Sequence, residues 1–158
     1  MFDLVNGLPV HPLVVHAVVV LLPLACLGTL AIALRPAWRE RYGVLVVACA
    51  AVATVLIPVA TSSGEALEKR VGDPGRHAEL GDQLIWFAVP LLVLSLALVV
   101  LDRRQRRSVE PTGERRTPVL TRAVAVLALV AAIAASVQVY RVGDSGAKAV
   151  WGDQVAAR

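Results

Sequence analysis

Residues 10–34 read VHPLVVHAVVVLLPLACLGTLAIAL, and the 22 residues from Leu13 to Leu34 include no Asp, Glu, Lys or Arg. A helix rises about 1.5 Å per residue, so this run spans roughly 33 Å, close to the bilayer hydrocarbon thickness of about 30 Å. Two of the three histidines of the chain, His11 and His16, lie at its start. The stretch therefore predicts a transmembrane helix that opens with two side chains able to bind a ligand.

Three further runs without charged residues follow, at residues 42–64, 83–101 and 123–140. The chain is 57% hydrophobic and only 18% charged, which is too apolar for a water-soluble domain of 158 residues. We therefore expect an all-α fold, an integral membrane four-helix bundle that forms a single domain over residues 1–158. The expected spans are about 13–34, 43–62, 79–101 and 119–142, and residues 65–70 predict a short surface helix between the second and third spans.

The last of these spans is rich in alanine. Ala128 and Ala132 are four residues apart, as are Ala131 and Ala135, and small residues at this spacing allow helices to approach closely. This predicts that the last span packs inside the bundle. No internal repeat is evident along the sequence.

Lys and Arg are distributed unevenly between the two sides that four spans define. Residues 35–43 and 102–122 carry ten of the 16 Lys and Arg residues, and the other six are spread over the remaining segments. Short loops rich in Lys and Arg stay in the cytoplasm. We therefore expect a protein of the bacterial inner membrane with both termini and the short helix outside. The basic segments suit anionic lipid head groups, and without a recognition module they do not indicate nucleic-acid binding.

With this topology, polar residues from the ends of different helices share the extracytoplasmic face: His11, His16, Glu65, His77, Asp144 and Lys148. The simplest interpretation is that they cap helices and pack, with Asp144 paired to Lys148 or Arg141. His16 lies among valines and alanine, so a buried imidazole there would need a partner from another helix. Ionisable groups at such depths are also candidates for function.

Three chemistries fit these side chains. In the first, His16 and His77 hold one b-type haem as axial ligands, with His11 close by, and the protein carries electrons in the membrane. In the second, two or three of the histidines bind zinc or copper together with Asp144 or Glu65. In the third, Asp144 or Glu65 exchanges protons with His16 at a proton or quinone site.

These hypotheses do not make the chain an enzyme by itself, because it offers no persuasive catalytic triad. A hypothesis of a different class is that the chain is a membrane interaction subunit without a cofactor. Its tail at residues 143–151 would then dock a redox protein or another membrane protein. The turn that opens this tail supplies the remaining candidates: Gly143, Asp144, Ser145, Gly146 and Lys148.

Both ends of the chain are similar to a known family. The opening FDLVNGLPVHPLVVH (residues 2–16), with its G-x-P-x-H-P-x-x-V-H pattern, and the closing RVGDSGAKAVW (residues 141–151) resemble the bacterial four-helix membrane family called domain of unknown function 2231. The resemblance covers nearly the whole chain and implies four spans and a role for His11, His16 and the turn at residues 143–146. Relatives joined to or encoded near iron–sulfur or cytochrome proteins favour the haem hypothesis by analogy. Relatives that carry histidine in place of Asp144 make His16 and His77 the preferred ligand pair.

Overall fold

A computed structural model of the chain describes residues 4–5, 8–72, 75–107 and 119–156. The elements of this part are β1 (Leu4–Val5), β2 (Leu8–Pro9), α1 (Val10–Leu34), α2 (Pro36–Val71), α3 (Arg76–Gln83), α4 (Ile85–Arg107) and α5 (Val119–Ala156). β1 and β2 form a short antiparallel ladder. Four helical segments are long and apolar enough to cross a membrane, with α3 and α4 together forming the third, Arg76–Arg107. The predicted all-α bundle of four spans is confirmed.

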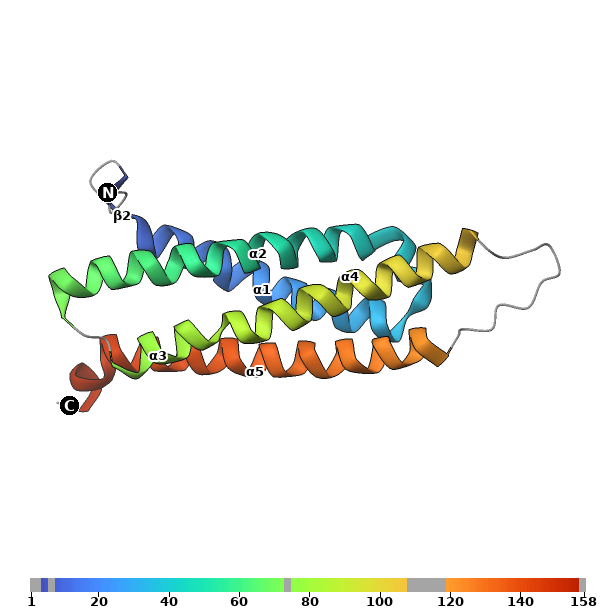
Figure 1. The fold of residues 1–158 in the computed structure, drawn as a ribbon. Helices are drawn as coiled ribbons and strands as arrows, with labels where there is room; N and C mark the ends of the chain where they lie inside the picture. Colours follow the sequence, from blue (N-terminus) through green and yellow to red (C-terminus); the bar gives the residue numbers. More distant parts are fainter. Residues whose placement is uncertain (1–3, 6–7, 73–74, 108–118, 157–158) are drawn as a thin grey trace.

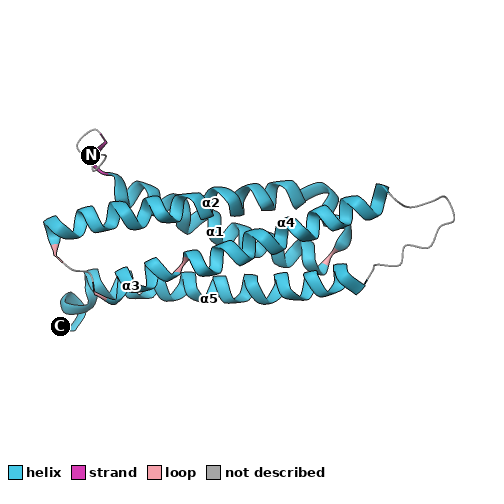
Figure 2. Ribbon diagram, viewed as in Figure 1, coloured by secondary structure: helices cyan, strands magenta, loops and turns pink. Residues whose placement is uncertain are grey.

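The four long helices form a ring in which each packs against two neighbours. α1 and α4 both pack against α2 and α5, and the short α3 packs against α5. Figures 1 and 2 show the long helices running along one common axis, with the N-terminal and C-terminal parts of the chain at the same end of the bundle. We call this the histidine end, because it holds His11 and His77, and the opposite end the arginine end, because it holds Arg39 and Arg106.

Many small side chains lie in the interior of the bundle beside a few large ones such as Leu22 and Leu91, and many large aliphatic side chains point outward. The fully buried alanines are Ala50, Ala53, Ala88, Ala128, Ala132 and Ala135. Leu27 and Leu45, in contrast, are 64% and 62% exposed. This pattern fits lipid as the surrounding solvent, because helices in a membrane associate through close packing rather than through exclusion of water. The predicted contact surface of the last span is confirmed for Ala128, Ala132 and Ala135, whereas Ala131 is only partly buried.

The predicted boundaries of the second span are wrong at both ends. α2 begins at Pro36, directly after Arg35, so residues 36–43 are helical rather than a loop. Proline suits the first helical position, where its missing N–H costs nothing. α2 also continues to Val71, so residues 65–70 are its last turns and not a separate helix. Within this helix, the hydroxyl of Ser62 bonds back to the carbonyl of Pro58 at 2.8 Å. The short helix before the third span is α3 instead.

The arginine end is closed by a buried ion-pair network that the expected loop did not predict. Arg39 is only 3% exposed, and its Nε and Nη2 donate to the carbonyls of Ile32 and Ala33 at 2.8 and 3.1 Å. These carbonyls belong to the last turn of α1 and have no partner within that helix, so Arg39 caps it. The Nη1 atom of Arg39 lies 3.7 Å from Asp102 on α4. Three helices are thereby joined at one guanidinium.

Candidate binding cavity

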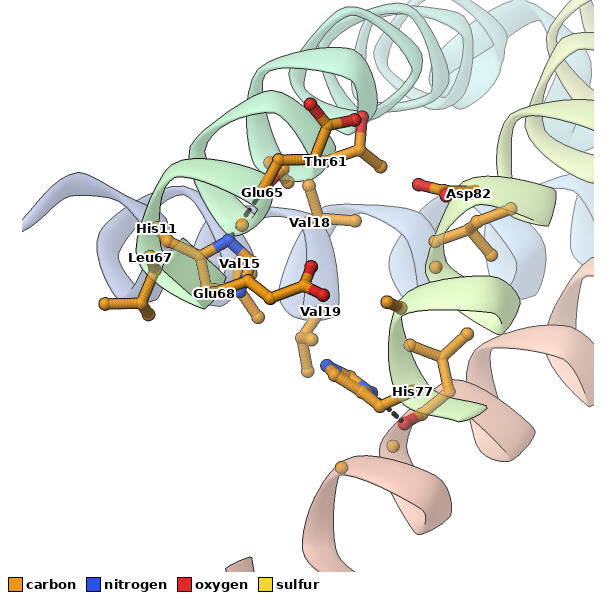
Figure 3. Close-up of a pocket in the computed structure, with 18 of the residues that line it drawn as sticks. His11, Val15, Val18, Val19, Thr61, Glu65, Leu67, Glu68, His77 and Asp82 are labelled. Atoms are coloured by element: carbon orange, nitrogen blue, oxygen red, sulfur yellow. Dashed lines mark hydrogen bonds between the residues drawn. The ribbon is translucent and has the colours of Figure 1, made fainter. Parts of the chain in front are cut away.

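A cavity of about 500 Å³ lies at the histidine end, lined by α1, α2, α3 and α5. Its walls are largely aliphatic and include Val15, Val18, Leu84 and Val139. This volume falls in the range of about 300–1,000 Å³ that is typical of small-molecule and cofactor sites. Figure 3 shows His11 and His77 on different sides of this cavity. Both imidazoles are partly buried.

His11 is held by the end of α2. Its Nδ1 lies 2.8 Å from the carbonyl oxygen of Ala60 and 3.4 Å from the hydroxyl of Ser63. The same hydroxyl donates to the Ala60 carbonyl at 3.0 Å. A Cβ added to Gly64 would lie only 3.0 Å from Cε1 of the imidazole. The ring therefore rests directly on the backbone of α2, where only glycine leaves it enough room.

His77 is held by α5 in the same way. Its Nδ1 lies 3.1 Å from the carbonyl oxygen of Val142 and 3.4 Å from the hydroxyl of Ser145. Ser145 donates to the Val142 carbonyl at 2.9 Å. A Cβ added to Gly146 would again lie 3.0 Å from Cε1 of the imidazole. We call each set of histidine, carbonyl, serine and glycine a histidine module.

The two modules reveal a duplication that the sequence analysis missed. The segments ATSSG (residues 60–64) and VGDSG (residues 142–146) supply carbonyl, serine and glycine at the same spacing. The matching histidines open α1 and α3, so the α1–α2 hairpin corresponds to the hairpin of α3, α4 and α5. The shared signal is only a serine–glycine pair and a histidine far away in sequence. Such a signal becomes evident only when the helices are placed together.

Each module also fixes the tautomer of its histidine. A carbonyl oxygen can only accept, so Nδ1 of both rings must carry the hydrogen. In the neutral imidazole, Nε2 then holds a lone pair. Nε2 has no hydrogen-bond partner in either ring within the part of the chain that the structure describes. The cavity is therefore flanked by two hydrogen-bond acceptors that are free for a ligand.

The charged groups around the cavity are all acidic. Glu65, Glu68 and Asp82 line it, and the described lining residues include no Lys or Arg. The rim thus favours a neutral or cationic molecule over an anionic one. Glu65 is the one sequence-predicted carboxylate that the structure brings to the histidines, whereas Glu68 and Asp82 were not among the candidates.

His16 lies apart from this cavity. It is exposed, it is not among the lining residues, and its Nδ1 bonds to the carbonyl of Pro12 in the same helix at 2.5 Å. The expectation that His16 needs a partner from another helix is therefore wrong, because it is not buried and its own helix supplies the carbonyl. The structure brings together His11 and His77, not His16 and His77.

The candidate turn at residues 143–148 is helical. α5 runs through it to Ala156, beyond the predicted limit of about 142. Asp144 pairs with Lys148 at 2.8 Å, one helical turn away, as the simplest interpretation predicted, and neither residue lines the cavity. Gly143 and Gly146 do line it. No group of three His, Cys, Asp or Glu side chains in the described ranges is arranged to hold a metal ion.

Comparison with known proteins adds the family. A family model described as "Predicted membrane protein (DUF2231)" matches residues 7–158. The chain belongs to the DUF2231 family of membrane proteins. No curated protein and no solved structure matches the chain. The suspected family is thus confirmed, and the DUF2231 match includes both histidine modules.

Proposed function

We propose that this DUF2231 protein binds a quinol, a neutral lipid-soluble molecule with hydroxyls on opposite sides of its ring. The observation that carries the proposal is the pair of histidine modules, which leave two Nε2 acceptors on different sides of one cavity of about 500 Å³. Each Nε2 accepts a hydrogen bond from one hydroxyl. His11 and His77 thus take the role that the sequence analysis assigned to His16 in a quinone site.

The surroundings of the histidines support a neutral ligand from the bilayer. The aliphatic walls match the ring and its substituents, and the acidic rim disfavours an anion. Val19 lines the cavity and is 53% exposed, so the cavity is open rather than sealed within the bundle. Glu65 and Glu68 add carboxylates to the cavity lining, and carboxylates can act as proton donors and acceptors.

A b-type haem is the second candidate, and the tautomer of the two histidines favours it. Histidine ligands of metals usually donate one ring N–H to a carbonyl or carboxylate, as His11 and His77 do. The free Nε2 atoms suit iron, and a haem would supply reversible one-electron chemistry. Glu65, Glu68 and Asp82, however, would repel the propionates of the macrocycle. The donor atoms therefore fit haem, whereas the charge of the rim fits a quinol better.

Binding of duroquinol to the detergent-purified protein, measured by equilibrium dialysis, tests the proposal. Losing one imidazole leaves a buried hydroxyl without its acceptor, which costs about 1–3 kcal/mol, or roughly 5- to 150-fold in affinity. We expect this loss in His11→Ala and in His77→Ala. His16→Ala is the matched control, because it removes the third histidine outside the cavity, and it should bind like the parent.

Absorbance spectra of the same samples, oxidised and then reduced with dithionite, separate the two candidates. Haem bands that vanish in His11→Ala and His77→Ala but persist in His16→Ala would assign the cavity to haem and overturn the quinol proposal. Equal duroquinol affinity in all four proteins would remove both histidines from the site. Selective loss of duroquinol binding without haem bands would support the proposal.

A further inference from the structure

Two exposed arginines and two exposed aromatic rings lie next to one another at the start of α2, beginning with its N-cap residue Arg35. The guanidinium carbon of Arg35 lies 5.0 Å from the ring centre of Trp38, and that of Arg41 lies 5.4 Å from the ring centre of Tyr42. The two rings meet edge to face, with 6.0 Å between their centres. We call these four residues the aromatic–arginine patch. All four are exposed.

The arginines of this patch have no carboxylate partner in the described part of the chain. Arg106 binds the nearby Glu40 at 2.6 Å and Asp102 at 2.7 Å. Arg39 faces Asp102 as well. Arg35 and Arg41 contact aromatic faces instead, which hold each guanidinium plane in place and leave its N–H groups free at the edge. Two such groups suit the oxygens of a phosphate.

The position of the patch indicates what carries that phosphate. Leu34 precedes it and is 68% exposed, and Leu45 lies one turn after Arg41 and is 62% exposed. The patch is therefore continuous with the apolar outer surface of the span, at the depth where aromatic residues meet lipid head groups. A molecule with a phosphate at one end and acyl chains at the other covers both parts.

We propose that the aromatic–arginine patch is a binding site for an anionic phospholipid. Arg35 and Arg41 hold its phosphate, Trp38 and Tyr42 pack beside the head group, and its acyl chains lie along the exposed leucines. An anionic head group is preferred over a zwitterionic one because the patch has two cations and no acidic residue of its own. This site is independent of the cavity at the opposite end of the bundle.

Quenching of Trp38 fluorescence by brominated lipids tests this proposal. The two other tryptophans, Trp86 and Trp151, are exposed and are replaced by Phe, which leaves Trp38 as the reporter. The protein is reconstituted in phosphatidylcholine vesicles that contain increasing amounts of brominated phosphatidylglycerol or brominated phosphatidylcholine. We expect half-maximal quenching at a several-fold lower mole fraction of phosphatidylglycerol.

Two pairs of substitutions locate the effect. Arg35→Gln with Arg41→Gln should bring the phosphatidylglycerol curve to the phosphatidylcholine curve. Arg103→Gln with Arg107→Gln is the matched control, because both are exposed arginines at the same end of α4. That pair should keep the preference.

Three results would overturn the proposal. Equal quenching by both lipids in the parent protein needs no folded variant and would remove the site. A preference that survives the first pair, or that falls equally in both pairs, would reflect another site or general charge. Loss of the preference on adding millimolar inorganic phosphate would assign the patch to soluble anions.

Discussion

Arg39 at the arginine end and the two module histidines at the other end are polar side chains placed within one apolar bundle, but they are satisfied differently. Arg39 donates to two carbonyls of α1 through Nε and Nη2, and its Nη1 faces Asp102 at 3.7 Å without a hydrogen bond among the described residues, so the guanidinium is enclosed by protein. His11 and His77 each use one nitrogen on a carbonyl and leave the other beside a cavity. A closed network favours stability, whereas half-satisfied groups favour binding. The same fold therefore separates a structural end from a candidate binding end.

The contrast between the arginine end and the histidine end fails if the two ends do not lie on opposite sides of a membrane. We replace Cys26 and Cys49 by Ala and introduce a single cysteine, either Arg107→Cys at the arginine end or Gly152→Cys at the histidine end. The distribution of Lys and Arg predicts that a membrane-impermeant thiol reagent labels intact cells only at residue 152. Labelling of residue 107 alone would reverse the orientation, and labelling of both in intact cells would contradict a sided insertion.

Removal of Arg39 should have the largest effect on stability. Arg39→Met leaves the buried carbonyls of Ile32 and Ala33 without their donor, while Asp102 keeps its ion pair with Arg106, and each acceptor left unpaired costs about 1–3 kcal/mol. We expect this fall in the free energy of unfolding in a detergent denaturation titration. The exposed control Arg103→Met should stay within about 0.5 kcal/mol. A loss below about 1 kcal/mol in Arg39→Met would show that Arg39 does not stabilise the arginine end.

Adding a methyl group beside each imidazole should weaken binding with little loss of stability. In Gly64→Ala or Gly146→Ala, the new Cβ would lie 3.0 Å from an imidazole carbon, so the ring must shift. We expect about tenfold weaker duroquinol binding, or roughly 1.4 kcal/mol, and a similar effect in both modules. Gly152→Ala, whose Cβ would meet nothing within 4 Å, is the control on α5. A large effect in only one module would contradict their equivalence.

The serines of the modules should contribute least. Ser63 and Ser145 lie 3.4 Å from their imidazoles, whereas the carbonyls at 2.8 and 3.1 Å already orient the rings. We expect Ser63→Ala and Ser145→Ala to change duroquinol affinity by less than about threefold, in keeping with one weak hydrogen bond. A loss as large as that of His77→Ala, seen in the same dialysis experiment, would make the hydroxyl rather than the carbonyl the main support of the ring.

The sequence predicted the spans well and the ends of the helices poorly. The uncharged run of α1 forms a span whatever its neighbours are. Lipid offers no hydrogen bonds to the backbone, so every backbone group must be satisfied within the helix itself. Where a helix ends depends instead on a few weak local contacts. Residues 35–43 looked like a basic loop, yet Arg39 is buried on α2 because it caps α1. Residues 65–70 continue α2, although the hydroxyls and the glycine before them are typical of a helix end.

The sequence predicted what kind of candidate site to expect, but not which residues form it. The sequence indicated a histidine site at the end that holds both termini, and it singled out His11 and His77 together with His16. α1 begins at Val10, so both histidines are helical and lie about 140° apart around the axis, too far apart to face the same neighbour. This placement turns His11 towards α2 and leaves His16 exposed.

The sequence by itself determined that the chain forms four apolar helices with polar residues gathered at their ends, since transfer into lipid depends on each segment alone. The tertiary structure decided which of these residues act together. His11 meets a carbonyl 49 residues away, and His77 meets one 65 residues away. Gly64 and Gly146 have a role only because an imidazole from another helix lies against them. Such contacts depend on packing between distant segments, and no local pattern in the chain encodes them.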